Sequence, residues 1–459
     1  MKKVFFLLMA ATMMLPAIAQ DKSARDSIGT EKTKTIHLGD KVRVVPYGFV
    51  RNYLTVDSRK TYTVIGGEYN MIPYDEDWNM TEAVAQALDL ERTDLNAVPE
   101  VKFQALTTRF GFNLDGPVIW GAKTSGKIEG DFGGFGTNNT VLRLRHAYMK
   151  FVWCNEEGLQ NEVLAGQTWH PLSGGVMPDV LGMAAGAPFR PHSRTPQIAY
   201  TMSTQAGLGF SAAMLWQLQY MYNGPKDLLG GSTNSIDFAN RAMIPEVFLG
   251  LNYRSDHVYL QIGGDMQPIR PRNFRTVTGY QQTTDELFCS FTPTFYFQYT
   301  KDKFSFKSRY LYAGNTSHVN QLNGYGVTDV AADGTWSYAP LHAHIAYANF
   351  AYGKKVRGNM FLGFMKNVGA GENLYNFGTA ASPVYYIYMK GAQNFTHLDG
   401  VWRVAPGISY NVKAFNIGLE YEVTGASYGD WDKDGGILNN DNLHTVVNHR
   451  ICAMMKYNF

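Results

Sequence analysis

The chain has 459 residues, of which 45% are hydrophobic and only 17% charged, with 28 Tyr, 27 Phe and 46 Gly. This composition argues against a disordered protein and against a nucleic-acid-binding protein. The formal net charge is +2 at pH 7 and falls to near zero without Lys2 and Lys3, so no polyanionic partner is indicated. The cysteines, Cys154, Cys289 and Cys452, form no CxxC pair, and we expect no disulfide framework, metal site or cofactor.

The N-terminus predicts that the protein is exported. Two lysines precede an apolar stretch from Val4 to Leu15, and small residues follow at Ala17 and Ala19. This pattern predicts a Sec-type signal peptide over residues 1–19, with a retained N-terminal helix as the weaker alternative. Residues 20–41 are polar and mixed in charge, which predicts a short periplasmic lead-in.

The mean hydropathy of the whole chain is −0.23, and beyond the N-terminus no apolar run reaches about 18 residues, which argues against a helical membrane protein. Instead, segments with period-2 alternation or many β-formers recur along residues 42–459. Sixteen are expected to be strands: 42–56, 102–114, 123–133, 140–153, 161–169, 197–203, 207–220, 246–254, 257–267, 287–300, 303–313, 341–352, 356–366, 401–410, 415–425 and 445–459. An even number is what a bacterial outer-membrane barrel requires.

The connections between these segments alternate between short and long. Two-residue turns are predicted at Ser255-Asp256, Lys301-Asp302, Gly353-Lys354 and Val412-Lys413, while the intervening connections are long. Short periplasmic turns and long external loops are typical of an outer-membrane barrel. The sequence therefore predicts an all-β fold, a 16-stranded antiparallel transmembrane β-barrel, rather than a soluble jelly roll.

The alternation of apolar and polar residues expected of a barrel strand is also visible within single segments. In the segment 207–220, every second residue from Leu208 to Tyr220 is mostly apolar, as expected of a face in contact with lipid. The residues between them are smaller or more polar, as expected of a face toward a water-filled interior. The last strand alternates likewise and ends on Phe459, which resembles the signal by which outer-membrane barrels are recognised by their assembly machinery. Two segments depart from the pattern. The apolar spacing of residues 81–95 predicts an amphipathic helix in the first external loop, either capping the mouth or packed on the rim. In the segment 140–153 the alternation of apolar and polar residues shifts by one position, which predicts a β-bulge near His146.

The central third of the chain resembles a known family. The stretches Thr108 to Gly111, Thr124 to Lys127, Leu142 to Tyr148 and Leu164 to Trp169 are similar to the DcaP-like porins of Bacteroidetes-type bacteria. The resemblance implies a homotrimeric 16-stranded outer-membrane porin whose narrowed, basic pore favours small anionic solutes such as carboxylates.

The predicted strand phases place ten bases and seven acids inside the barrel, so we expect a modestly basic lumen. The bases that lie well inside their strands are the candidates for the constriction: Arg109, Arg143, Arg145, Arg309 and Arg450. Guanidinium groups stay charged and grip carboxylates with two parallel hydrogen bonds. The alternative is that these arginines pair with Glu129, Asp131 or Glu420 and only brace the wall.

The third external loop, residues 170–196, is expected to fold into the lumen. It is rich in Gly and Pro and has few charges before Arg190, His192 and Arg194. Asp179, opposite these bases, would complete a transverse field. The alternative is an ordinary external loop.

These features predict an integral protein of the outer membrane of a Gram-negative cell, acting as a passive diffusion porin for small hydrophilic solutes with a modest preference for anions. It would contact membrane lipid and lipopolysaccharide, small anionic solutes and the barrel assembly machinery, with no nucleic-acid partner and no catalytic residue. The alternatives are a barrel enzyme of the lipase or protease type, for which no GxSxG elbow is present, and a channel for hydrophobic solutes.

Overall fold

A computed structural model describes residues 35–39, 41–64, 69–134, 141–173, 177–182, 186–226, 231–389 and 397–459. The predicted signal peptide and the lead-in up to residue 34 lie outside the described residues. Among the helices that the model describes, none is long and apolar enough to cross a membrane.

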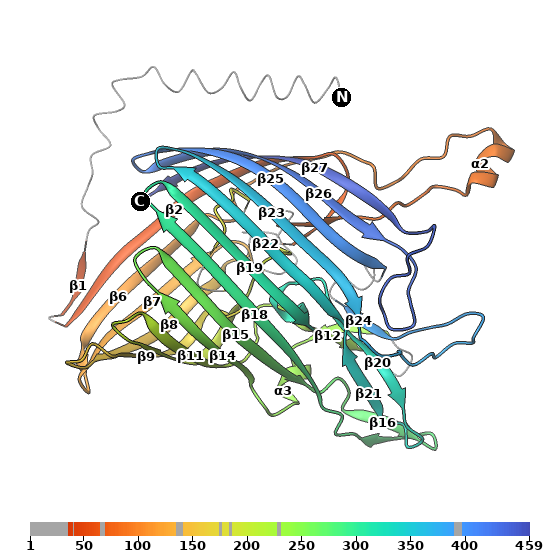
Figure 1. Cartoon of the computed structure of the whole chain (residues 1–459), viewed down its shortest axis with the longest axis horizontal. Coiled ribbons are helices and arrows are strands. Elements are labelled where there is room, and N and C mark those ends of the chain that lie inside the picture. The colour runs from red at the N-terminus through yellow and green to blue at the C-terminus, as the bar shows by residue number, and fades with distance from the viewer. Residues whose placement is uncertain are drawn as a thin grey trace.

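The predicted barrel is confirmed: sixteen strand positions close into one antiparallel barrel (Figure 1). Around the wall, its strands are β2 (Val42–Asp57), β6 (Arg109–Ile119), β7 (Ala122–Asp131), β8 (Arg143–Cys154), β9 (Gln160–Trp169), β10 (Arg194–Ser203), β11 (Leu208–Leu215), β14 (Glu246–Arg254), β15 (Val258–Ile269), β18 (Phe288–Lys301), β19 (Phe304–Gly314), β22 (His342–Gly353), β23 (Val356–Gly369), β25 (Leu398–Val412), β26 (Phe415–Tyr428) and β27 (His444–Asn458). The short strand β5 (Glu100–Gln104) continues the position of β6, since both pair with β2.

The barrel closes where the last strand meets the first. β27 pairs with β2 from Asn458↔Phe49 to Arg450↔Asp57. Phe459 exchanges two backbone hydrogen bonds with Gly48, at 3.1 and 3.0 Å. Its ring lies so close to Gly48 that a Cβ there would come within 2.5 Å of it, so the seam requires glycine.

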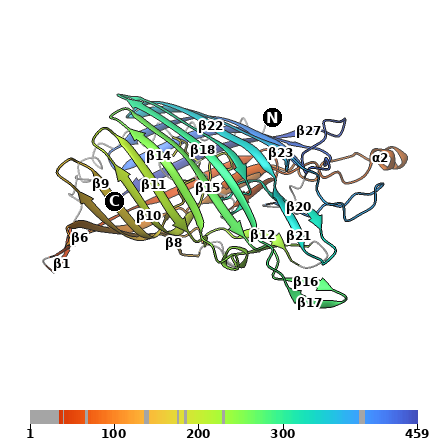
Figure 2. The same cartoon turned by 60° about the horizontal axis from the view of Figure 1, so that its bottom comes forward.

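The remaining elements precede β2 or lie in the long connections. They are β1 (Ile36–Leu38), β3 (Thr61–Val64), β4 (Tyr69–Pro73), α2 (Glu82–Leu88), β12 (Tyr222–Pro225), β13 (Ser232–Ser235), α3 (Asp237–Asn240), β16 (Phe274–Val277), β17 (Tyr280–Thr283), the 3-10 helix η2 (Ser317–Val319), β20 (Gly324–Val330), β21 (Trp336–Pro340) and β24 (Ile387–Met389). The long connections leave the barrel at one end, where α2 and the β16–β17 hairpin project (Figures 1 and 2).

The short turns lie at the opposite end, as predicted, and so does the C-terminus (Figure 1). They join β14 to β15, β18 to β19, β22 to β23 and β25 to β26. Asp302 and Lys413 have φ of 54° and 48°, the left-handed backbone that tight hairpin turns need. This geometry explains the two-residue spacing seen in the sequence.

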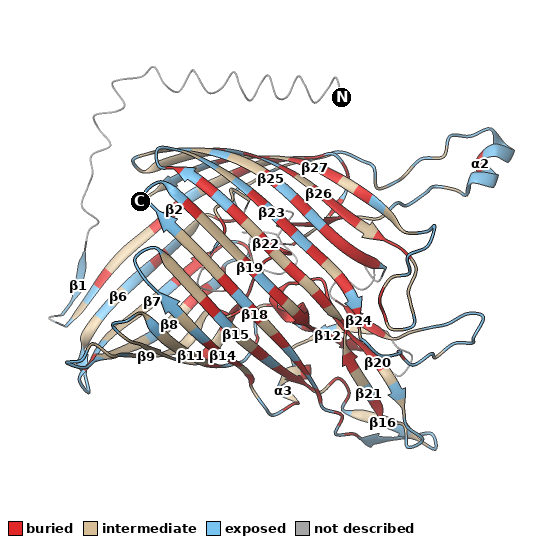
Figure 3. Cartoon of the chain, in the orientation of Figure 1, coloured by how far each residue is buried: buried red, intermediate tan, exposed pale blue. Residues whose placement is uncertain are grey.

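Buried and exposed residues alternate along the wall strands (Figure 3). In β18, Phe291 is 58% exposed on the outside, whereas Thr292 and Tyr296 are buried inside. β27 follows its predicted phase, with Met455 and Tyr457 exposed and Arg450 buried. An apolar outer face and a polar inner face are what a barrel in lipid requires.

One strand is shorter than predicted. β11 ends at Leu215, not at Tyr220, because the side chain of Gln217 accepts hydrogen bonds from the backbone N–H groups of residues 218 and 219, each at 2.9 Å. A side chain that bonds its own backbone competes with the ladder of the sheet. The chain therefore turns inward, and Tyr220 is buried in the interior rather than facing lipid.

Two further predictions concern the part of the barrel near its outer end. The helix expected over 81–95 spans only α2, because Asp89 adopts the left-handed conformation, φ 52°, and stops it. It projects from the barrel instead of capping the mouth (Figure 1). The bulge near His146 is confirmed: Glu129 pairs with His146, but the next residue of β7, Gly130, pairs with Leu144.

Three connections fill the outer part of the barrel interior. They are loop 1 (residues 58–99), loop 3 (170–193) and loop 6 (315–341). Their apolar side chains form one buried cluster with the inner wall, to which they contribute Tyr69, Met71, Ile72, Leu172, Phe189, Val319 and Leu322. Burying these side chains holds the loops inside the barrel.

Candidate pore constriction

Loop 3 crosses the barrel interior and bonds to strands far from its own roots on β9 and β10. The backbone N–H of Asp179 donates to Asn349 Oδ1 on β22 at 2.6 Å. The N–H groups of Leu181 and Gly182 donate to the two oxygens of Glu420 on β26, at 2.8 and 3.1 Å. One carboxylate thus holds the middle of the loop against the far wall.

The second half of loop 3 packs on β23 and β25. The rings of Phe189 and Phe361 lie 6.0 Å apart, and Arg403 donates from Nη1 to the carbonyl of Ala187 at 2.9 Å. A Cβ at Gly363 would come within 2.4 Å of the Phe189 ring. Glycine at this position therefore lets the loop lie directly on the strand.

Behind the loop, β7 and β8 carry a buried network of ion pairs. Arg143 binds Asp131 through two hydrogen bonds, from Nε at 2.9 Å and Nη2 at 2.8 Å. Arg145 bridges both acids, donating to Glu129 at 2.7 Å and to Asp131 at 2.6 Å. These two candidate arginines match the bracing alternative, because each is already held by a carboxylate.

Two other arginines meet at the end of loop 3 without a carboxylate. Arg190 lies 4.9 Å and Arg194 4.2 Å from the ring centre of Trp169, both within cation–π range. Arg190 donates to the carbonyl of Ser173, and Arg194 Nη1 donates to Gln219 Oε1 at 3.2 Å. Nε and Nη1 of Arg190 and Nε and Nη2 of Arg194 are buried without a hydrogen-bond partner among the described residues.

The two pairs of arginines share one electrostatic neighbourhood. Burial, together with the nearby charge of Arg309, lowers the pKa of Arg190 to about 10, so its guanidinium stays charged at neutral pH. Among the described residues, Glu129 and Asp131 are the carboxylates paired with these four guanidinium groups, and the members of the set that they bind are Arg143 and Arg145. The excess of positive charge lies at Arg190 and Arg194, which were predicted as site residues.

The remaining predicted site residues lie in separate contacts. Arg109 is 3.5 Å from Glu129 and keeps 20% of its side chain exposed. Arg309 stacks on Tyr296 at 4.3 Å. Arg450 is bound by Asp57 on β2 through two bonds of 2.8 Å.

Asp179 faces a different set of bases from those expected. It binds Arg357 at 2.9 Å and Lys307 at 3.1 Å, and the side chains of these two bases are 27% and 16% exposed. Asp179 thus forms local ion pairs with bases of β19 and β23, and the expected transverse pairing with the bases at the end of loop 3 is not seen. The expected partners, Arg190 and Arg194, are instead gathered on Trp169.

Several residues of the site had no signal in the sequence. Tyr69 in loop 1 bonds His192 Nε2 at 2.7 Å, and Tyr220 reaches the other ring nitrogen at 3.3 Å. Arg403 also binds the carbonyls of Asn70 and Met71, at 2.9 and 3.2 Å. Loop 1 was not predicted to enter the barrel, and only the apolar run from Tyr69 to Ile72 could have indicated it.

One group of side chains has the donor atoms of a metal centre. The ligand atoms of His170, Glu246, Asp265 and His318 all lie within 4.8 Å of one another, and all four residues are buried. The backbone N–H of Leu172, however, donates to Nδ1 of His170 at 3.1 Å, so the hydrogen of the neutral ring is on Nε2, the atom that faces Glu246. We therefore interpret the group as a hydrogen-bonded clamp around Glu246.

Comparisons with known proteins find similarity in structure alone. No family model matches the chain, and no curated protein matches it. The outer-membrane channel DcaP of Acinetobacter baumannii superposes with a TM-score of 0.60 at 16% identity, over 92% of this chain and 99% of that chain.

Two further porins align at lower scores. OmpF of Salmonella typhi, solved with daunomycin, gives a TM-score of 0.46 at 11% identity, over 93% of this chain and 100% of the other. The anion-selective porin of Comamonas acidovorans gives 0.47 at 10% identity, over 91% and 100%. The likeness to DcaP shows that the chain has the fold of an outer-membrane porin barrel.

Proposed function

We propose that this chain is an integral outer-membrane porin, a passive diffusion channel for small hydrophilic solutes that prefers anions such as carboxylates. The observation that carries the proposal is the pair Arg190 and Arg194, charged and buried on Trp169 without a carboxylate partner. A buried charge without a counter-ion is costly unless a mobile ion compensates it. A passing carboxylate is such an ion.

The chemistry of the group favours carboxylates over halides. A guanidinium presents a planar fork of N–H donors that matches the two oxygens of a carboxylate. Four buried nitrogens of these two arginines have no hydrogen-bond partner among the described residues. Because both side chains are buried, their positive charge would attract carboxylates into the pore through space, without trapping them.

The proposal is tested with the purified protein in a planar bilayer. Under a salt gradient we expect ion channels whose reversal potential has the sign of anion selectivity. We also expect a small dicarboxylate to reduce the chloride current at concentrations where an uncharged sugar of similar size does not. Cation selectivity, or the absence of channels from correctly folded protein, would contradict the proposal.

Two alternative functions have less support. Among the described residues, the side chains bonded to histidine rings are Tyr, Thr, Gln or carboxylate groups, and no serine hydroxyl is bonded to one. A serine hydrolase needs such a pair. The inner wall also carries charges at Arg143, Arg145 and Arg450, which a channel for hydrophobic solutes would avoid. We expect neither lipid nor peptide hydrolysis by the purified protein.

We further propose that the porin is a homotrimer, embedded among lipid and lipopolysaccharide, whose last strand is read by the assembly machinery. The exposed apolar side chains of the outer wall, among them Phe291 and Leu251, support contact with lipid or with a neighbouring barrel. Native mass spectrometry in mild detergent tests the oligomer. A species with the mass of three chains supports the trimer, and monomers alone would contradict it.

A further inference from the structure

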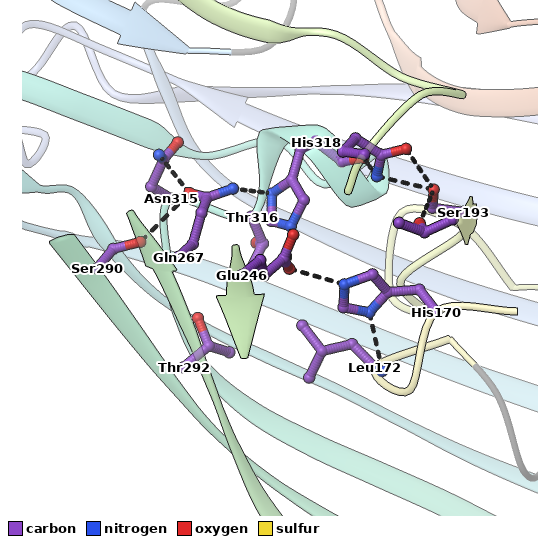
Figure 4. A network of polar contacts seen from close by, with 12 residues as sticks. His170, Leu172, Ser193, Glu246, Gln267, Ser290, Thr292, Asn315, Thr316 and His318 are labelled. Carbon is purple, nitrogen blue, oxygen red and sulfur yellow. Dashed lines mark hydrogen bonds and ion pairs between the residues drawn. The ribbon is translucent and has the colours of Figure 1, made fainter. Parts of the chain in front are cut away.

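Glu246 lies at a point where two inward loops meet the barrel wall (Figure 4). It is the first residue of β14 and is buried. Its Oε1 is 2.7 Å from Nε2 of His170, the first residue of loop 3, and 2.8 Å from Nε2 of His318, in η2 of loop 6. A single carboxylate oxygen thus joins both loops to the wall.

The directions of these hydrogen bonds follow from the groups behind the rings. Nδ1 of His170 accepts from the backbone N–H of Leu172. Oε1 of Gln267 accepts from Asn315 at 2.7 Å and from Ser290 at 3.3 Å, so its amide nitrogen faces Nδ1 of His318 (Figure 4). A ring whose Nδ1 accepts is neutral and carries its hydrogen on Nε2. Both rings therefore donate to Glu246.

Other titratable and charged groups face the clamp. Asp265 on β15 belongs to the same buried group, whose ligand atoms all lie within 4.8 Å of one another. Tyr222 on β12 reaches Glu246 Oε2 at 3.4 Å and stacks on His318 at 5.1 Å. Arg309 on β19 contributes a positive charge near His170.

Further bonds tie the same two loops to each other. The N–H of His192 donates to the carbonyl of Val319 at 2.7 Å. Gln217 donates to the carbonyl of His318 at 2.7 Å and to Ser193 Oγ at 2.9 Å. His170 follows Trp169 and Ser193 precedes Arg194, so the clamp lies directly behind the arginines of the constriction.

We propose that Glu246 is a positioning residue that holds loops 3 and 6 in place while His170 and His318 are neutral, and that acidification releases both loops. Protonating His170 removes the acceptor at Nδ1 and turns the ring against the Leu172 N–H. Protonating Glu246 removes the common acceptor. The consequence for gating rests on the proposed channel function, whereas the release of the loops does not.

The pKa of His170 supports this reading. Burial lowers it, and the charge of Arg309 acts in the same direction, against Glu246. A histidine whose pKa is lowered by folding stabilises the native contacts fully above its unfolded value of about 6.5, and this contribution falls as the pH drops below it. The clamp is therefore expected to weaken on acidification and not on alkalinisation.

Hydrogen–deuterium exchange of the whole barrel tests the proposal without a current. In the wild type, the amides of loop 3 and of η2 should be protected from exchange at pH 7. At pH 5, local opening of these segments should be about tenfold more frequent, after correction for the pH dependence of intrinsic exchange. Glu246→Gln should show the more frequent opening already at pH 7. Glu162→Gln, which removes a carboxylate bonded to Lys150 at 3.2 Å, is the matched control and should behave as wild type.

A second variant guards against misfolding of the first. In His170→Gln the amide can still donate to Glu246 but does not titrate, so loop 3 should stay protected at pH 7 and lose most of its response to acid. Unchanged protection and pH response in both variants would overturn the proposal. So would one zinc ion per chain that survives chelator treatment, because the clamp would then be a metal centre. If the loops respond but no channels form, the proposed function fails and the clamp stands.

Discussion

The wall and loop 3 hold their arginines in opposite ways. Arg143 and Arg145 on β8 are bound by Asp131 and Glu129, with every contact between 2.6 and 2.9 Å. Arg190, near the end of loop 3, and Arg194, the first residue of β10, lie on Trp169, and no carboxylate of the described residues is bonded to either. The same side chain is therefore neutralised by carboxylates in one region and is buried on an aromatic ring in the other.

The largest effect is expected from breaking the wall network. Asp131→Asn removes the carboxylate that binds both Arg143 and Arg145. Because a buried charge that loses its partner is left uncompensated, we expect a loss of about 3 to 5 kcal/mol in the free energy of unfolding. Urea unfolding in lipid vesicles measures it.

The exposed ion pair of Arg43 with Asp115 is the control for this prediction. Asp115→Asn is expected to cost less than about 1 kcal/mol, because solvent screens an exposed pair. Equal losses in the two variants would show that burial does not set the strength of the wall network.

A smaller effect is expected from crowding loop 3. In Gly363→Ala the new Cβ would meet the Phe189 ring at 2.4 Å. Overpacking costs about 1 to 3 kcal/mol or displaces the loop, so both unfolding and single-channel conductance should change. Gly358→Ala on the same strand is the control, since nothing lies within 4 Å of its Cβ, and it should leave conductance unchanged.

Arg145→Lys separates charge from geometry. Lysine keeps the positive charge but cannot bridge Glu129 and Asp131 with a planar fork. We expect a loss of about 1 to 2 kcal/mol in stability, with the reversal potential unchanged. A shifted reversal potential at normal stability would mean that the wall arginines also select ions.

The smallest effect is expected at the outer surface, where His444 of β27 binds Asp75 of loop 1 at 2.6 Å. Burial opposes protonation, but hydrogen bonds to the Asn442 carbonyl and to Asp75 raise the pKa of His444 above its usual value. Its contribution is therefore present below about pH 6.5 and lost as the pH rises through the raised pKa. Because the pair is partly exposed, we expect no more than about 0.5 kcal/mol.

Asp75→Asn provides the measurement for this surface pair. Thermal unfolding of the wild type between pH 6 and 8 should show a slight loss of stability that the variant lacks. Identical pH profiles for the two proteins would show that the pair of His444 and Asp75 does not contribute to stability.

The strands of the barrel could be predicted from sequence because each is a local pattern. The alternation in β18 and β27 and the two-residue turns at Asp302 and Lys413 depend only on neighbouring residues. β11 was overextended because the backbone contacts of Gln217 break the ladder without breaking the alternation.

The candidate site was predictable only in part. The inward phase of Arg143 and Arg145 follows from the strand pattern, but their partners are fixed by the register between β7 and β8. The stacking of Arg190 and Arg194 on Trp169, and the entry of loops 1 and 6, depend on contacts between residues far apart in sequence. No local pattern encodes such contacts.

The account's central claim is that Arg190 and Arg194, where loop 3 joins β10, select anions, whereas the ion pairs of β7 and β8 do not. The most direct test is the reversal potential in a planar bilayer under a salt gradient, for two charge-removing variants compared with the wild type. Arg190→Gln with Arg194→Gln should lose most of the anion preference, whereas Arg143→Gln with Asp131→Asn, which removes one charge of each sign, should keep it. An unchanged reversal potential in the loop variant, or a loss confined to the wall variant, would contradict the claim.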